Sequence, residues 1–195
     1  MEMHCEHIGG DMGPIGSVLG SNWALNGRLQ ITLRPIRAQD LGLEIAFVNS
    51  LSQQTRYDRL MSLRKLSHAE LVRMTDLDLA RELALIATVC VDGTEQQIGV
   101  ARCVRLGDNG TQGEMAIVIG DAWQGLGLGE KLLRALIDAA AEAGVRLMTG
   151  TTLSTNHRLI ALARKLGFKP QRVPGDATVM NVSKALGKFA ALPLM

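Results

Sequence analysis

The hydrophobic positions of the chain recur with two periods, one typical of strands and one typical of helices. Residues 30–36 alternate polar and apolar side chains, as a half-buried strand does. Residues 126–143 place Leu128, Leu132 and Leu136 on one stripe opposite charged residues, which predicts an amphipathic helix. In chain order, the two periods predict a strand at 30–36, helices at 40–51, 53–61 and after Ser67, strands at 83–92, 97–106 and 115–119, a helix at 126–143, a strand at 146–151, a helix at 156–166, and strands at 168–172 and 178–184. Strands and helices interleave without strict alternation, which favours an α/β fold (α+β) with a mixed sheet and helices on both faces.

Short polar motifs mark where these elements begin and how they are held. Residues 67–70 form a capping box, Ser-His-Ala-Glu, that predicts a helix start, and Asp40 can cap the helix that runs to about Leu51. Residues 92–93, Asp-Gly, predict a tight hairpin between two strands. Within the long helix, Arg134 and Asp138 are spaced for a stabilising ion pair.

We expect one domain, residues 30–186, between two short appendages. Residues 1–29 are rich in glycine and lack sustained periodicity, so they are predicted to be an extension that the chemistry does not need. Residues 187–195 form a C-terminal tail.

Composition narrows the classes of function. The 195 residues are 47% hydrophobic and 21% charged, as in an ordinary globular domain, and too apolar for a disordered chain. A net charge of +2 and an aromatic content of 3% predict no nucleic-acid partner. The longest apolar stretch, residues 83–91, is about half of a membrane span, and the first 27 residues lack the basic region of a signal peptide. We therefore expect a cytoplasmic protein with no membrane partner.

The number and positions of the cysteines also favour a location in the cytoplasm. Cys5, Cys90 and Cys103 are odd in number, and two of them lie in apolar strand-like runs. We interpret them as small buried hydrophobic residues of a reducing compartment, without a disulfide framework. His4 and His7 flank Cys5, but no second ligand pair follows at zinc spacing, so we predict no metal site.

A glycine-rich turn before the long helix is the strongest chemical signal. The strand that ends at Gly120 leads through Gln124 into Gly125, Leu126, Gly127, Leu128 and Gly129. Glycines let the backbone turn tightly, and the unpaired amides at a helix start face outward with the positive end of the helix dipole. The turn is therefore predicted to bind a phosphate or pyrophosphate.

Two common phosphate-binding patterns do not match this turn. No Lys-Ser or Lys-Thr follows the glycines, as the P-loop requires. Glu130 occupies the last glycine position of the dinucleotide pattern. ATP and NAD are therefore disfavoured.

The turn resembles the Q/R-x-x-G-x-G/A acyl-CoA loop of the GCN5-related N-acetyltransferases (GNAT), and the resemblance covers residues 30–186. Asn156, Ala161, residues 164–165 and residues 167–168 are similar to the second motif of that family. Residues 67–70, 75–76 and 81–84 further resemble the acetyltransferase domain of bacterial Pat-type protein lysine acetyltransferases. The resemblance implies a mostly antiparallel sheet of six or seven strands that splays apart at the acyl-CoA site.

The resemblance also implies roles for individual residues. Backbone groups of Ile117 and Ile119, with Val118 between them, would pair with the pantetheine arm of acetyl-CoA and hold the thioester carbonyl. The amides from Gln124 to Glu130 would hold the pyrophosphate, and the side chain of Asn156 would contact the cofactor. No metal is implied.

Glu114 is the candidate general base. It begins the apolar strand, where strand alternation puts it on one face with Ala116 and Val118, and its position matches the base of Pat-like enzymes. Its alternative is a solvated or ion-paired residue beside Arg102 or Arg105. The presence of this carboxylate favours an enzyme over a non-catalytic acyl-CoA-binding module.

One position departs from the family. Ala163 stands where many members have the tyrosine that protonates the departing thiolate, and the single tyrosine of the chain is Tyr57. We therefore expect the thiolate to leave unaided, or to take its proton from water or another residue.

The predicted function is acyl-CoA-dependent N-acetyl transfer to a primary amine, with a protein lysine as the first candidate acceptor. A small amine or amino acid as acceptor, and a non-catalytic acyl-CoA-binding module, remain alternatives. The sequence leaves open whether the chain acts alone or as a homodimer.

Overall fold

Strands and helices interleave along the chain in the computed structural model, which describes residues 22–25, 29–61, 64–107 and 109–187. In order, the elements are β1 (Asn22–Leu25), β2 (Leu29–Pro35), the 3-10 helix η1 (Ala38–Asp40), α1 (Leu41–Ser50), α2 (Gln53–Leu60), α3 (His68–Thr75), β3 (Glu82–Val91), β4 (Thr94–Leu106), β5 (Gln112–Ile119), the 3-10 helix η2 (Asp121–Trp123), α4 (Leu128–Glu142), β6 (Leu147–Leu153), α5 (His157–Lys165), β7 (Lys169–Val173) and β8 (Asp176–Ala185). From β2 onward, every predicted strand and helix is present with bounds close to those expected.

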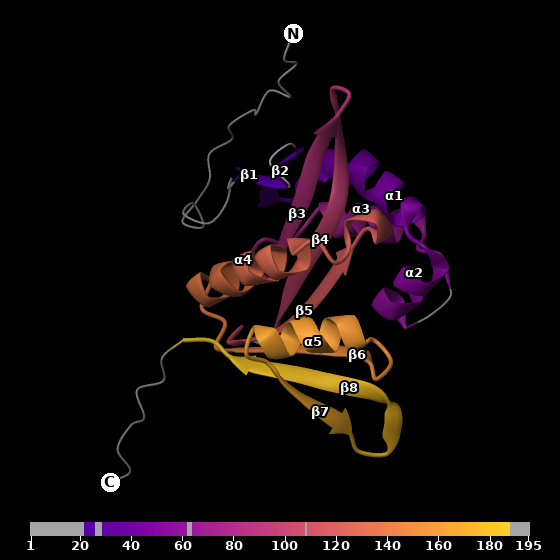
Figure 1. The fold of residues 1–195 in the computed structure, drawn as a ribbon. Coiled ribbons are helices and arrows are strands. Elements are labelled where there is room, and N and C mark those ends of the chain that lie inside the picture. The colour runs from indigo at the N-terminus through magenta and orange to yellow at the C-terminus, as the bar shows by residue number, and fades with distance from the viewer. Residues whose placement is uncertain (1–21, 26–28, 62–63, 108, 188–195) are drawn as a thin grey trace.

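The strands form one sheet in the order β1-β2-β3-β4-β5-β6-β8-β7 (Figure 1). Neighbouring strands are antiparallel except β5 and β6, so the predicted fold class is confirmed. Among the described residues the sheet has eight strands, where six or seven were expected. The additional strand is β1, which pairs with β2 although residues 22–25 fall in the range predicted to be an extension.

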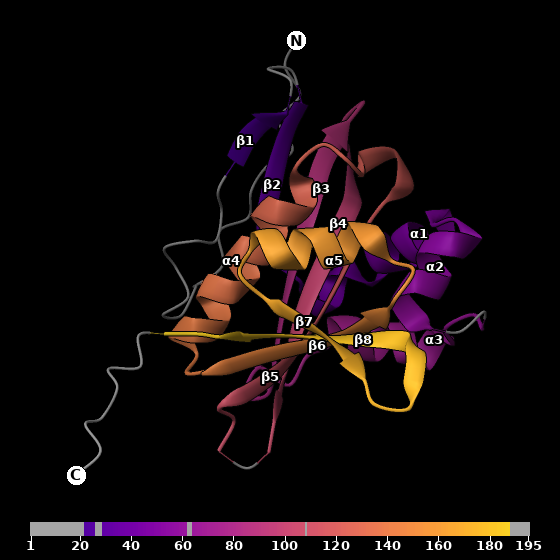
Figure 2. The same ribbon diagram turned by 60° about the horizontal axis from the view of Figure 1, so that its bottom comes forward.

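Helices cover both faces of the sheet because its central strands are apolar on both sides. All six residues from Ala84 to Val89 are buried, so successive side chains enter opposite hydrophobic clusters. Leu85 belongs to the cluster beneath α4 and Ile86 to the cluster with Phe47 of α1. Figure 2 shows α4 and α5 lying together, with α1, α2 and α3 grouped on the other side.

Asp40 stands at the start of α1 but does not cap it. Its carboxylate accepts a hydrogen bond from the amide of Arg37 (2.8 Å) and pairs with the guanidinium of Arg34 (2.7 Å). An unpaired buried carboxylate costs more free energy than a missing helix cap. The side chain of Asp40 therefore forms the ion pair and leaves α1 without a side-chain cap.

The cysteines differ from the expectation at one position. Cys90 on β3 is disulfide-bonded, so its interpretation as a reduced thiol is wrong. Cys103 on β4 is a free, fully buried thiol, and this burial raises its pKa to about 11. Disulfide formation depends on the distance between two Cα atoms in space, which spacing along a sequence does not give. Cys5, His4 and His7 lie outside the described residues.

The described part of the chain holds neither a membrane-spanning helix nor a cluster of metal ligands. None of its helices is both long enough and apolar enough to cross a membrane. No three of its His, Cys, Asp or Glu side chains are grouped so that they could hold a metal ion.

Candidate functional site

A gap between β5 and β6 is the central feature of the site. These two parallel strands pair only through Gln112–Glu114 and Leu147–Thr149. Beyond these pairs the strands separate, and β6 and β8 run at a steep angle to β3, β4 and β5 (Figure 1). Residues 115–119 therefore have no strand partner on this edge among the described residues. We call this gap the slot.

The backbone of β5 presents polar groups to the slot at alternate positions. The amide of Gly120 donates to the carbonyl of Ile98 on β4 (2.9 Å), so even-numbered residues of β5 face β4. The backbone groups of Ile117 and Ile119 consequently face the slot. The Ile119 carbonyl is already engaged there, because the side-chain amide of Gln124 donates to it (3.1 Å).

The glycine-rich turn closes one end of the slot. Gly125 and Gly127 have φ values of +77° and +81°, which favour glycine, and α4 begins at the next residue. From Gly125 to Glu130, no backbone amide donates a hydrogen bond to any described group. Six consecutive donors without a described partner at a helix start are suited to bind an anion.

The slot and the turn open into a cleft of about 990 Å³. Of the residues singled out from the sequence, its lining includes Ile117, Val118, Ile119, Gln124, Gly125, Gly127, Gly129, Glu130 and Asn156. Leu128 is buried in the core and Leu126 is an exposed residue outside the lining, so these two can contribute only backbone amides. Most of the remaining lining comes from α2 and α5. The family's second motif had pointed to α5 through Ala161 and Lys165, whereas no pattern in the sequence connected α2 with the site.

Cations gather where the turn meets α5. Glu130 pairs with Lys165 (2.6 Å) and Arg134 (3.1 Å), and hydrogen bonds from these two side chains lower its pKa. The predicted pair of Arg134 with Asp138 is wrong, because a glutamate on the N-terminal side of an arginine has the more favourable geometry in a helix. Arg158 and Lys165 both line the cleft, so positive charge stands beside the free amides.

The family of the chain follows from comparison with known proteins. Residues 30–169 match the model of the family described as "Acetyltransferase (GNAT) domain". The chain belongs to the GNAT acetyltransferase family. The slot between β5 and β6 is thus the splay that the resemblance implied.

Individual GNAT relatives agree with this assignment. The chain is 35% identical over 165 residues to Acetyltransferase PA5475 of Pseudomonas aeruginosa, which covers 83% of this chain and 88% of that protein. It is 33% identical over 135 residues to Acetyltransferase Pat of Mycolicibacterium smegmatis, which covers 69% of this chain and 40% of that protein.

Solved structures share the fold. The GNAT domain of S. lividans PAT matches with a TM-score of 0.74 and 24% identity, over 86% of this chain and 97% of that chain. The structure of yncA from Salmonella typhimurium with its cofactor acetyl-CoA matches with a TM-score of 0.65 and 21% identity, over 83% of this chain and 97% of that chain.

A hydrogen-bond network ties α2 to η2, which leads into the glycine-rich turn. The carboxylate of Asp121 in η2 accepts from the amide and hydroxyl of Ser52 (2.9 and 2.7 Å) and from the hydroxyl of Thr55 (2.7 Å). Although partial burial opposes the shift, hydrogen bonds from Ser52 and Thr55 lower the pKa of Asp121. The network fixes α2 as one wall of the cleft.

Gln124 extends this network across the cleft. Its side-chain nitrogen also donates to the hydroxyl of Thr55 (3.3 Å), and its side-chain oxygen accepts from Arg158 of α5. Both ends of its amide are therefore occupied by protein groups. The side chain joins β5, α2 and α5 at the end of the slot.

Asn156 likewise has a structural partner. Its side-chain oxygen accepts from the amide of Leu159 (3.1 Å) and caps α5. The residue lines the cleft from the end of β6. This cap fixes the first residue of α5, the helix that carries Arg158 and Lys165.

Glu114 lies on β5 at the last residue that pairs with β6. Its side chain is exposed and shares a face with Val118, although it does not line the cleft. Arg102 pairs instead with Glu44, and Arg105 donates to backbone carbonyls, so neither arginine engages Glu114. The carboxylate is left available.

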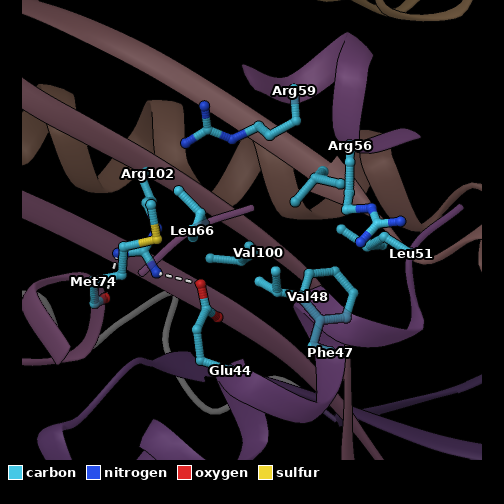
Figure 3. A pocket seen from close by; sticks show the side chains of 11 residues that line it. Glu44, Phe47, Val48, Leu51, Arg56, Arg59, Leu66, Met74, Val100 and Arg102 are labelled. Carbon is cyan, nitrogen blue, oxygen red and sulfur yellow. Dashed lines mark hydrogen bonds and ion pairs between the residues drawn. The ribbon is translucent and has the colours of Figure 1, made fainter. Parts of the chain in front are cut away.

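A second cavity of about 30 Å³ lies between α1, α2, α3 and the sheet (Figure 3). Arg59 and Val118 line both this cavity and the cleft, so the two spaces are neighbours. Glu44 is almost fully buried at the floor, where it accepts from Gln97 (2.5 Å) and pairs with Arg102 (2.9 Å).

The position of the family's usual tyrosine holds no acid in this GNAT domain. Ala163 is fully buried in the core, and Tyr57 on α2 lines neither cavity. Neither residue 163 nor Tyr57 therefore supplies a tyrosine hydroxyl to a thiolate in the slot.

Proposed function

We propose that this protein is an acetyl-CoA-dependent N-acetyltransferase acting on a primary amine, with a protein lysine as the first candidate acceptor. The observation that carries the proposal is the slot between β5 and β6, which ends at six free amides. Family membership supports it, as does the acetyl-CoA complex of yncA, a protein of the same fold. We assign the chemistry to residues 30–186.

The free backbone groups of the slot suit the pantetheine arm. An amide-bearing chain can pair like a strand with the N–H and C=O of Ile117 and with the N–H of Ile119. The Ile119 carbonyl is not available while Gln124 donates to it. Gln124 is thus assigned a positioning role, and Val118 lines the slot between the two paired residues.

The glycine loop suits the pyrophosphate. The amides of residues 125–130 have no partner among the described residues, and Lys165 and Arg158 line the same cleft. Each hydrogen bond from an amide to a charged phosphate oxygen contributes about 1.5–3 kcal/mol. Asn156 supports this region by fixing the start of α5.

The reaction is direct attack of the amine nitrogen on the thioester carbonyl carbon. Glu114, directly or through water, takes one proton from the ammonium, so that the neutral amine attacks. The new C–N bond forms as the C–S bond breaks, the thiolate leaves as coenzyme A, and the nitrogen releases its second proton to water as the amide forms. A lysine of pKa about 10.4 needs roughly 4.6 kcal/mol to be neutral at pH 7. A positioned base supplies about 10²–10⁴-fold, or roughly 2.7–5.4 kcal/mol, which meets most of that need.

The leaving group needs less help. A thiol has a pKa of about 8.5, so a thiolate is a stable leaving group near neutral pH. With Ala163 in place of tyrosine, the proton that the thiolate takes up comes from water in the open cleft.

Transfer of labelled acetyl groups tests the proposal. The protein is incubated with acetyl-CoA labelled in the acetyl group and a cell lysate, and protein and small-molecule fractions are counted separately. Label on protein lysines supports the first candidate acceptor, and label in small amines supports the alternative acceptor class. Binding of acetyl-CoA without any transfer would leave only a non-catalytic module, and absence of binding would refute the assignment.

A further inference from the structure

Arg59 is a cation at the junction of the two cavities that has no partner among the described residues. It lies on α2 and lines both the cleft and the 30 Å³ cavity. Its guanidinium makes no hydrogen bond or ion pair with any described residue, although the residue is only partly exposed. In Figure 3 its side chain extends over the cavity, on the side opposite Glu44. A guanidinium has five N–H donors, so an unpaired one beside a cavity is suited to bind an anion.

The charges around the small cavity favour the same ligand. Its lining holds three arginines, Arg56, Arg59 and Arg102, and one carboxylate, Glu44. Arg102 already pairs with that carboxylate. The pKa of Arg59 is lowered, because burial and the charge of Arg102 outweigh the opposite effect of the carboxylates of Glu44 and Glu114. The site is therefore short of negative charge.

We propose that Arg59 binds a carboxylate carried by the acceptor, close to the amine that is acetylated. This inference rests on the proposed function, whose acceptor class it narrows. A cavity of about 30 Å³ has room for roughly two water-sized groups, since one needs about 10–15 Å³. That space suits the two oxygens of a carboxylate and excludes a large side chain.

The position of Arg59 places the amine at the reacting atoms. Val118, which borders both cavities, lies between the two residues whose backbones face the slot. Glu114 lies on the same strand face as Val118, since strand alternation puts residues 114, 116 and 118 on one side. An acceptor held at Arg59 by its carboxylate thus has its amine between the thioester and the base. Apolar walls from Phe47 and Val48 exclude water from the ion pair.

A carboxylate near an amine can come from two sources. A free amino acid carries its own, and a protein lysine can have an acidic residue beside it. Two matched pairs of acceptors distinguish them: N-α-acetyl-lysine against its amide, and a one-lysine peptide with glutamate beside the lysine against the same peptide with glutamine. The two members of each pair have nearly the same shape and differ only in whether they carry the negative charge of the carboxylate.

The experiment measures kcat/KM for these four acceptors with the full chain and three variants. We expect the wild type to prefer the carboxylate member of one pair by about 10- to 100-fold, the range of a charge-assisted hydrogen bond. Arg59→Gln should bring that preference close to one. Arg59→Lys should keep part of it, because lysine retains the charge but not the paired donors. Arg73→Gln on α3, an exposed arginine outside both cavities, is the matched control and should keep the wild-type preference.

The outcomes separate this inference from the proposed function. Equal rates for both members of each pair in the wild type, or an unchanged preference in Arg59→Gln, would overturn the role of Arg59 while leaving acetyl transfer intact. If no acceptor is acetylated, calorimetric titration of the acceptors onto the protein decides. Equal affinity for the carboxylate and amide members then overturns the inference, and failure of acetyl-CoA itself to bind overturns the proposed function.

Discussion

Substitution of Gly127 by valine separates the backbone requirement of the loop from its role in binding. Gly127 has a φ of +81°, and no atom lies within 4 Å of where its Cβ would be. A side chain there has no clash within the protein but enters the space where phosphates would approach. Adoption of a left-handed conformation by an L-residue costs about 1–2 kcal/mol.

Gly144 offers a control with the same backbone penalty. It lies beyond the opposite end of α4 with a φ of +89°, and its Cβ position is also free of neighbours within 4 Å. It does not line the cleft. We expect Gly127→Val and Gly144→Val to lose similar stability, about 1–2 kcal/mol, or roughly 2–8 °C in Tm for a chain of this size.

Only Gly127→Val should lose affinity for acetyl-CoA. Displacement of the pyrophosphate breaks hydrogen bonds to charged oxygens that contribute about 1.5–3 kcal/mol each, so each lost bond weakens binding by about 10- to 100-fold. Calorimetric titration with acetyl-CoA measures this difference. Acetyl-pantetheine, which has no pyrophosphate, should bind equally to the wild type and both variants.

Two results would refute this reasoning. A folded Gly127→Val protein with wild-type affinity for acetyl-CoA would remove the pyrophosphate from the loop. A matching loss of affinity in Gly144→Val would show that strain in α4, and not contact with the phosphates, controls binding.

Further changes test the base, the α2 anchor and the N-terminal segment. Glu114→Gln should keep acetyl-CoA affinity but lower kcat at pH 7 by about 10²–10⁴-fold, with a deficit that shrinks toward pH 10; wild-type turnover across that range would assign the base elsewhere. Asp121→Ala removes the acceptor of Ser52 and Thr55 and should lower the free energy of unfolding by about 1–3 kcal/mol in denaturant titrations. Because the folded-state pKa of Asp121 is lowered, its contribution is present above the unfolded pKa and is lost as the pH falls through the folded value, so wild type and Asp121→Ala should converge in stability in acid. A chain that begins at Arg28 should keep its acetyl-CoA affinity, since β1 lies at the sheet edge far from the slot; loss of binding would show that the segment supports the site.

Much of the site could be predicted from the sequence because its signals are local. The capping box at residues 67–70 forms as expected, since both partners lie within one helical turn. The hairpin at residues 92–93 has positive φ at both positions, as an Asp-Gly turn favours. The glycines at 125 and 127 adopt the left-handed conformations that only glycine accepts readily. Each of these features depends on residues that are neighbours in the chain.

Contacts between distant segments depended on the packing of the sheet and its helices. Nothing in a short polar helix such as α2 predicts that Thr55 and Asp121 share a hydrogen bond across 66 positions. The same holds for Gln124, whose motif position indicated contact with the cofactor while its side chain joins three elements. Arg59 lines the junction of two cavities only because α2 is anchored beside β5. Local spacing determines helix caps, turns and the free amides of a loop, whereas the partner of a charged side chain is chosen by burial and by which segments meet in space.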